Sequence, residues 1–294
     1  MIYTYPLEDK NIDLSNCIVR HSGDKTFAYK TVDGTPICMS VYYPQNYNQK
    51  QRYPAFFFIH GGGWASHKVF DGESGWQGDY LGYLARHYAD KGFVSVSIDY
   101  RLARDMAQTE GYQLFDLYLD CSEAVNYLLD HEDDYKIDTK QVYILGESAG
   151  GHLAGLMATK YKRNGFQFKS AFLVNAITEL VEDMEWNKRV PKNPTHEKLM
   201  GLSETECAKQ LSPLYNICED NCPVVLIHGC KDHCVNPIHS KSFYERMRGF
   251  SQECELHWIE DTDHAFLLAE YTSNLAACKI GIEIIDGYLE RVGK

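Results

Sequence analysis

Short runs of apolar, β-branched and aromatic residues recur along the chain, and the stretches between them are long enough to form helices. Such runs are typical of strands buried on both faces of a sheet. They predict strands at residues 55–59, 93–98, 142–145, 171–174, 224–227 and, with a weaker pattern, 255–259. Apolar residues also recur at the i, i+3, i+4, i+7 spacing of amphipathic helices from Leu114 to Leu128 and from Ile280 to Val292. This alternation predicts an α/β fold with a mostly parallel, doubly wound sheet flanked by helices.

An N-terminal segment precedes this alternation and has a different pattern. Residues 26–32 and 36–43 are both strand-like, and they lie on either side of Asp33-Gly34. An Asp-Gly pair favours a tight two-residue hairpin turn, because both positions must adopt positive φ. The two segments therefore predict a β-hairpin at one edge of the sheet.

The alternation is interrupted between residues 179 and 213, where the sequence becomes polar. Thr195 and Ser203 are suited to begin helices, and Ser203 and Glu206 have the spacing of a capping box. We interpret residues 179–213 as a small helical cap insertion above the sheet. The whole chain, residues 1–294, is then predicted to form a single α/β domain.

Charge and composition exclude several classes of partner. The formal net charge is −12 and no long run of like charges occurs, which argues against nucleic acids and anionic membranes. No apolar run approaches the roughly 18 residues that a membrane-spanning helix needs. The first ten residues lack the basic and apolar regions of a signal peptide, and 10 Cys in 294 residues are too sparse for a disulfide scaffold. We therefore expect a cytoplasmic protein with reduced thiols.

The first motif that carries chemistry is Gly146-Glu147-Ser148-Ala149-Gly150-Gly151, which directly follows the predicted strand 142–145 and precedes a helical stretch. A Gly-x-Ser-x-Gly sequence in this strand–turn–helix context predicts a nucleophile elbow. The sharp turn strains the serine backbone, so the flanking positions must be glycine to avoid a clash. The hydroxyl of Ser148 would then stand at a helix N-terminus, whose dipole favours developing negative charge.

A second glycine motif, His60-Gly61-Gly62-Gly63-Trp64, follows the predicted strand 55–59. Glycines at this place let backbone N–H groups approach an oxyanion without intervening side chains. We assign the oxyanion-hole donors to the backbone N–H groups of Gly62, Gly63 and Ala149. Among the three glycines at 61–63, the sequence leaves the choice of donors open by one position. The competing interpretation is a glycine-rich turn that only tightens the exit of the strand.

A nucleophilic serine needs a base and a group that orients the base. In the chain order serine, acid, histidine, the acid should follow a later strand, and Asp232 lies just beyond the strand predicted at 224–227. The histidine should follow the next strand, and His264 comes shortly after 255–259. With an ordinary pKa near 6.5, His264 would be mostly neutral and able to accept the Ser148 proton.

Other titratable residues compete for these roles and are less suitable. Several histidines fall too early or inside a predicted element, Asp220 precedes its strand, and two acids beside His264 are expected to be solvated; the rivals are His152, His233, His239, His257, Asp220, Asp261 and Asp263. His152 lies four residues after Ser148, one helical turn along, where packing is the better interpretation.

Cysteines crowd one region of the chain together with two histidines, and this raises the question of zinc. The residues concerned are Cys218, Cys222, Cys230, Cys234, Cys254, His228 and His233. Their spacing lacks the paired Cys-x-x-Cys knuckles of structural zinc sites. We therefore predict no metal and no other cofactor, and interpret these residues as buried or surface thiols and packed imidazoles.

With these motifs in place, the sequence resembles the α/β-hydrolase superfamily, specifically the hormone-sensitive-lipase-like and acetylxylan/feruloyl-esterase-like carboxylesterases. The resemblance extends from about residue 36 to the C-terminus and rests on His60-Gly61-Gly62-Gly63-Trp64, Asp99-Tyr100-Arg101-Leu102-Ala103 and Gly146-Glu147-Ser148-Ala149-Gly150-Gly151. Two positions depart from many relatives, which have Pro-Glu in place of Arg104-Asp105 and glycine in place of Ala265.

The resemblance implies hydrolysis of short acyl esters without a cofactor, with Ser148, Asp232 and His264 as the catalytic triad. Because the insertion is too short for the large lid of an interfacial lipase, we expect small-molecule esters as substrates, including acylated carbohydrates such as acetylated sugars or xylan fragments. The alternatives among enzymes are an amidase such as an arylformamidase, or a peptidase of the prolyl-oligopeptidase type. An alternative from another class is a noncatalytic small-molecule receptor, although such relatives lose the base that His264 would supply.

Overall fold

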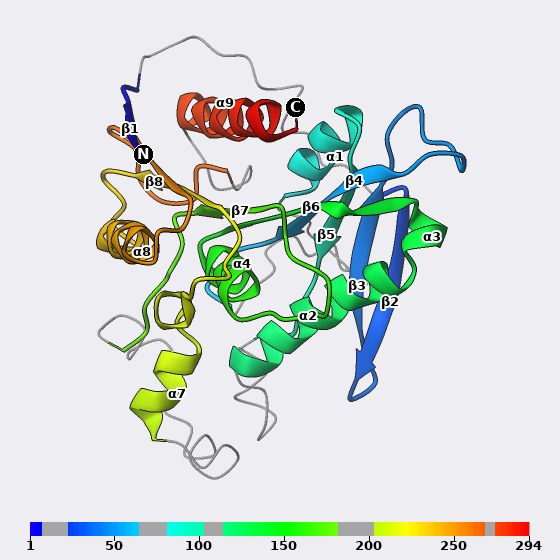
Figure 1. Cartoon of the computed structure of the whole chain (residues 1–294), viewed down its shortest axis with the longest axis horizontal. Helices are drawn as coiled ribbons and strands as arrows, with labels where there is room; N and C mark the ends of the chain where they lie inside the picture. The colour runs from blue at the N-terminus through cyan, green and yellow to red at the C-terminus, as the bar shows by residue number, and fades with distance from the viewer. Residues whose placement is uncertain (8–22, 65–80, 103–113, 182–202, 268–273, 294) are drawn as a thin grey trace.

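A nine-stranded sheet forms the centre of the molecule in a computed structural model (Figure 1), which describes residues 1–7, 23–64, 81–102, 114–181, 203–267 and 274–293. The strands, in the order in which they lie across the sheet, are β1 (Ile2–Tyr5), β9 (Cys254–Ile259), β8 (Val224–Gly229), β7 (Ser170–Val174), β6 (Ile137–Glu147), β4 (Tyr53–Ile59), β5 (Val94–Ile98), β3 (Thr35–Tyr42) and β2 (Lys25–Val32). Neighbours from β1 to β5 run parallel, whereas β3 and β2 are antiparallel to their neighbours.

Helices cover both faces of this sheet. The described helices are α1 (Gly82–Asp90), α2 (Leu114–Asp130), α3 (Glu132–Tyr135), α4 (Ala149–Thr159), α7 (Glu204–Gln210), the 3-10 turn η2 (Pro213–Asn216), α8 (Ile238–Gly249) and α9 (Leu275–Val292). Buried residues of α2, α4 and α8 pack with one face of the sheet, and those of α1 and α9 with the other (Figure 1). Side chains alternate between the two faces along a strand, so Phe57 and Ile59 join the first core and Phe56 and Phe58 the second. No described helix combines the length and the apolar character needed to cross a membrane.

The predicted fold class is confirmed, and so is each predicted strand and both amphipathic helices. The edge hairpin is confirmed as well, since β2 and β3 pair across a turn in which Asp33 has φ 48° and Gly34 φ 79°. Strand β1 was not predicted; it is a short segment that pairs parallel with β9, at the other end of the sequence.

The predicted cap insertion is described only in part. Ser203 caps α7 through a complete capping box with Glu206, as its spacing predicted. The proposed helix start at Thr195 lies outside the described residues, so the extent of an insertion at 179–213 and the single-domain organisation stay predictions. From α7 the chain continues through η2, which packs on α4 and so brings this segment onto the helix that follows Ser148.

Candidate active site

The nucleophile elbow has the geometry that its sequence predicts. Ser148 joins β6 to α4 with φ 57° and ψ −121°, a strained conformation for a residue that carries a side chain. Glycine is required on either side of it. A Cβ at Gly146 would lie 2.1 Å from the carbonyl oxygen of Gly150, and a Cβ at Gly150 would lie 2.0 Å from that of Ile59. The close approach at Gly150 presses the first turn of α4 against the end of β4, where the glycine loop begins.

Gly150→Ala is therefore expected to destabilise the protein by more than about 3 kcal/mol, beyond the usual cost of overpacking, because backbone atoms on both sides must move. The measurement is the midpoint of denaturant unfolding. Gly249→Ala is the matched control, since Gly249 ends α8 and no atom lies within 4 Å of a Cβ built there. Equal unfolding midpoints for the two variants would contradict the tight contact of α4 with β4.

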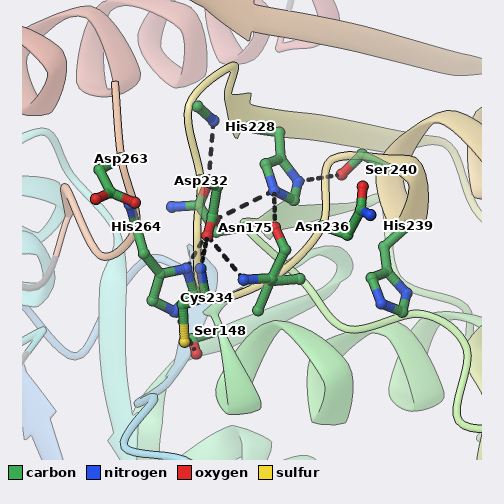
Figure 2. A network of polar contacts seen from close by, with 12 residues as sticks. Ser148, Asn175, His228, Asp232, Cys234, Asn236, His239, Ser240, Asp263 and His264 are labelled. Atoms are coloured by element: carbon green, nitrogen blue, oxygen red, sulfur yellow. Dashed lines mark hydrogen bonds and ion pairs between the residues drawn. The ribbon is translucent and has the colours of Figure 1, made fainter. Parts of the chain in front are cut away.

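The three residues predicted as a triad meet above the carboxyl ends of β6, β8 and β9 (Figure 2). The Nε2 atom of His264 lies 2.8 Å from the Oγ atom of Ser148, and its Nδ1 atom lies 2.7 Å from the Oδ2 atom of Asp232. The other carboxylate oxygen, Oδ1, accepts the backbone N–H groups of Cys234 (2.8 Å) and Val235 (2.7 Å). Ser148 and Asp232 are buried and His264 is half-buried. The predicted convergence of these side chains is thus confirmed.

The electrostatics of the triad follow from these contacts. Burial by itself would raise the pKa of Asp232, but hydrogen bonds from His228 and His264 outweigh it and lower the pKa of the carboxyl well below its usual range. Burial likewise opposes protonation of His264, but Asp232 and, to a lesser degree, the Cys234 side chain raise the pKa of the imidazole above its usual value. The expectation that His264 keeps an ordinary pKa near 6.5 is therefore wrong, because its partners favour the imidazolium.

A consequence for the pH dependence can be measured. Only the neutral imidazole can accept the Ser148 proton, so activity falls as pH drops through the pKa of His264. Because that pKa is raised, the acid limb of kcat/KM, which reports the free enzyme, is expected above about pH 6.5. A pH profile between 5 and 10 in buffers of constant ionic strength measures it. An acid limb at or below the ordinary histidine value would contradict the stabilised imidazolium.

A second histidine, His228, contacts the carboxylate of Asp232, and the sequence suggested it only as a metal ligand. The Nε2 atom of His228 lies 3.2 Å from Oδ2 of Asp232 and 3.1 Å from the carbonyl oxygen of Val235, and its Nδ1 atom lies 2.7 Å from Oγ of Ser240 (Figure 2). Burial lowers the pKa of His228, so the ring is a neutral donor that supports Asp232. The available signal was its place as the penultimate residue of β8, four positions before Asp232. No group of three or more potential metal ligands occurs in the part of the chain that the structure describes.

Tyr100, from the Asp99-Tyr100-Arg101-Leu102-Ala103 motif, holds the glycine loop at residues 60–64. The ring of Tyr100 stacks on His60 at 4.3 Å, and its hydroxyl donates to the carbonyl oxygens of His60 (2.8 Å) and Gly61 (3.3 Å). Gly62 and Gly63 then adopt φ 104° and 63°, conformations that glycine tolerates. The backbone N–H groups of these two residues and of Ala149 stay the predicted oxyanion donors.

The rival residues lie outside the proton relay. His152 is buried beneath the glycine loop, where it accepts the indole N–H of Trp64 (3.3 Å) and contacts the carbonyl oxygen of Leu211 (2.7 Å). Burial lowers the pKa of His152 to about 4, so it is a neutral packing residue, as expected. Asp263 is exposed, as expected, but Oδ1 also accepts the backbone N–H groups of His264 (2.7 Å) and His233 (3.0 Å), which joins the acid loop to the histidine loop.

The remaining rivals also have other partners. The ring of His257, within β9, stacks on Tyr3 and Tyr5 of the neighbouring strand β1. His239 is buried on α8, and its Nδ1 atom accepts the backbone N–H of Thr178 (3.3 Å). Asp261 forms an exposed ion pair with Lys231. None of these contacts reaches Ser148.

A strained serine between strand and helix, linked through an imidazole to a carboxylate at the carboxyl edge of a mostly parallel sheet, defines the serine-hydrolase class of the α/β-hydrolases. Within that class the family is also shown. The BD-FAE family model matches residues 39–247, which is more than half of the chain, so the chain belongs to this family.

Comparison with curated proteins gives distant relatives of larger size. The esterase LipC of Mycobacterium tuberculosis is 26% identical over 68% of this chain, and a non-reducing polyketide synthase of Emericella nidulans, pkbA, is 30% identical over 60% of it. The chain spans about half of LipC (49%) and only 7% of the synthase.

Among solved structures, esterase 2 of Thermogutta terrifontis with butyrate bound superposes with a TM-score of 0.73 at 25% identity, over 92% of this chain and 95% of that chain. The same esterase with propionate bound gives a TM-score of 0.74 at 24% identity, over the same shares. The α/β-hydrolase fold therefore extends over nearly the whole chain.

Proposed function

We propose that this chain is a carboxylesterase that cleaves short-chain acyl esters through an acyl-enzyme on Ser148. One observation carries the proposal: a continuous relay from Ser148 through His264 to Asp232, with contacts of 2.8 and 2.7 Å. Asp232 accepts the Nδ1 proton of His264, which leaves the lone pair of Nε2 facing the serine hydroxyl. That tautomer is the one a general base requires.

In the acylation half of the reaction, His264 removes the proton of Ser148 while Oγ attacks the ester carbonyl carbon. The negative charge that develops on the carbonyl oxygen is stabilised by the backbone N–H groups of Gly62, Gly63 and Ala149. Asp232 stabilises the imidazolium. Collapse of the tetrahedral intermediate breaks the bond to the alcohol, which leaves with the proton that His264 returns.

Deacylation repeats these steps with water as the nucleophile. His264 accepts a proton from the water, the oxygen adds to the acyl carbon, and the bond to Oγ of Ser148 breaks as the proton passes back to the serine. The products are a carboxylic acid and the regenerated hydroxyl. The residues present account for each proton transfer.

The substrate class is a proposal that rests on relatives. Propionate and butyrate are the acids bound in the two esterase 2 structures, and they support a short acyl chain. The BD-FAE family, named for acetylxylan and feruloyl esterases, supports an acylated carbohydrate such as an acetylated sugar or xylan fragment. We propose acetyl to butyryl esters of small alcohols, with acetylated xylo-oligosaccharides as the natural type.

The test has two parts. A fluorophosphonate probe should label the wild-type protein and not Ser148→Ala, which separates a serine hydrolase from a noncatalytic receptor. A series of p-nitrophenyl esters from acetyl to decanoyl, measured beside acetylated xylo-oligosaccharides and N-formylkynurenine, should give the highest kcat/KM at two to four acyl carbons. A preference for N-formylkynurenine would show an arylformamidase in place of an esterase. A wild-type protein that the probe does not label would overturn the proposal of a serine hydrolase.

A further inference from the structure

A fully buried carboxyl group lies directly before the nucleophile and takes no part in the proton relay. Glu147 is the last residue of β6 and is inaccessible to solvent. Its Oε1 atom accepts the backbone N–H of Leu267 (3.1 Å) and the side-chain amide of Asn175 (3.3 Å), while Oε2 has no hydrogen-bond partner among the described residues. Burying a carboxyl group with an unsatisfied oxygen costs folding free energy, so the presence of Glu147 at this position calls for a physical reason.

The peptide that Glu147 contacts is held from its other side as well. Leu267 is buried, and its carbonyl oxygen accepts the hydroxyl of Tyr83 on α1 at 2.6 Å. Its N–H and its C=O are therefore both engaged by buried side chains from separate elements, β6 and α1. Leu267 follows His264 by three residues, so this clamp anchors the segment that carries the base.

The segment between the base and the clamp is strained. Ala265 has φ 61°, in the left-handed region that residues with a Cβ adopt at a cost. Such a conformation persists only where the chain on both sides is constrained. On one side Asp263 accepts the N–H of His264, and on the other side Glu147 and Tyr83 hold Leu267.

The same carboxyl is also linked to the acid loop. Asn175, directly after β7, donates to Glu147 and accepts the backbone N–H of Gly229 (3.1 Å). Gly229 ends β8, three positions before Asp232. Glu147 thus connects the nucleophile elbow to both loops that bring its partners.

We infer that Glu147 is a positioning residue for His264, because its buried carboxylate holds Leu267 and thereby the strained turn between them. The inference rests on the proposed function, in which His264 must face Ser148. The ionisable groups that face the carboxyl are His264 and Asp232 on the adjoining loops and Tyr83 on α1. Of these, only His264 gains positive charge during the reaction.

The charge of Glu147 gives the inference a readout that packing alone would not produce. Burial raises the pKa of Glu147 to about 7, while the N–H of Leu267 and the charge of His264 act in the opposite direction. The carboxylate and the imidazolium therefore stabilise each other. Removing the negative charge should lower the pKa of His264 and move the acid limb of the pH profile to lower pH.

The experiment measures the second-order rate constant of fluorophosphonate labelling of Ser148 against pH, which requires no knowledge of the natural ester. In Glu147→Gln the plateau rate of labelling is expected to fall about ten-fold, because a small displacement of the base slows the reaction strongly. The acid limb of the pH profile is expected to move to lower pH. Ala265→Gly relieves the strain in the turn. The loss of plateau rate that Glu147→Gln causes should therefore be about two- to five-fold smaller when it is made in the Ala265→Gly variant than when it is made in the wild type.

A pair of tyrosine variants keeps the test valid should Glu147→Gln fold poorly. Tyr83→Phe removes the hydroxyl that holds Leu267, whereas Tyr88→Phe removes a buried hydroxyl from the same helix, where the ring packs on Phe56 and Phe58. Labelling should slow in the first variant and not in the second. An unlabelled wild type would overturn the proposed function and this inference together. A labelled wild type with an unshifted pH profile in Glu147→Gln, or equal rates in the two tyrosine variants, would overturn the inference alone.

Discussion

Ser148→Ala is expected to lower kcat by about 10⁶-fold while leaving the free energy of unfolding nearly unchanged. The hydroxyl of Ser148 is the atom that attacks, and its described side-chain hydrogen bond is the one to His264. Alanine fits the same backbone conformation, because the glycines on either side remain. Single-turnover kinetics with a p-nitrophenyl ester measure the loss, and denaturant unfolding monitored by circular dichroism checks the fold.

The double variant Ser148→Ala/His264→Ala distinguishes a triad from independent contributions. Residues that act as one unit are strongly non-additive, so His264→Ala should cost about as much as Ser148→Ala, and the double variant should cost hardly more than either. The remaining activity would come from the oxyanion donors and substrate binding. Losses that multiply in the double variant would show that the two side chains do not share one proton transfer.

Asp232→Asn is expected to lower kcat/KM by about 10⁴-fold through the wrong imidazole tautomer. Oδ1 accepts two backbone N–H groups, from Cys234 and Val235, so an asparagine would keep its oxygen there and turn its NH₂ toward His264. The Nδ1 atom would then have to accept, and Nε2 would carry the proton and face the serine as a donor. The same NH₂ would also meet the N–H of His228, which now donates to the carboxylate.

The matched control for this variant is Asp263→Asn in the neighbouring loop. Asp263 is exposed, and its Oδ1 atom accepts two backbone N–H groups that an amide oxygen can still accept. We expect a change in kcat/KM of less than about five-fold, as for most exposed substitutions. A loss below about ten-fold in Asp232→Asn, or equal losses in both variants, would contradict the assignment of Asp232 as the acid.

Much of the site was predictable because its signals are local. The nucleophile elbow is a turn that only glycine permits on both sides, and the structure shows the close backbone contacts that require it at Gly146 and Gly150. Asp232 and His264 could be chosen because loops after successive parallel strands meet at one edge of the sheet. In each case a short stretch of sequence carries the physical requirement by itself.

The residues that were missed act through contacts that only the folded chain reveals. His228 contacts Asp232 from the end of β8, and Glu147 contacts Leu267, 120 positions further along the chain. For Glu147 neither the residue type nor the spacing differs from that of a packing residue. His228 lies four positions before Asp232, but this spacing does not by itself show that the ring faces the carboxylate. The raised pKa of His264 was missed for the same reason, since it depends on which side chains meet it.

The sequence by itself determined the fold class, the hairpin at Asp33-Gly34, the sharp turn at Ser148 and which three side chains meet at the edge of the sheet. Each of these follows from hydrophobic periodicity, turn chemistry or chain order, which act over a few residues or obey general rules of parallel sheets. The tertiary structure alone decided the pairing of β1 with β9, the support of Asp232 by His228 and the clamp on Leu267. The first and the last of these join segments far apart in the sequence, and the contact of His228 with Asp232 depends on how the loop after β8 folds back on the strand. In each case burial and hydrogen-bond geometry select partners that no local pattern specifies.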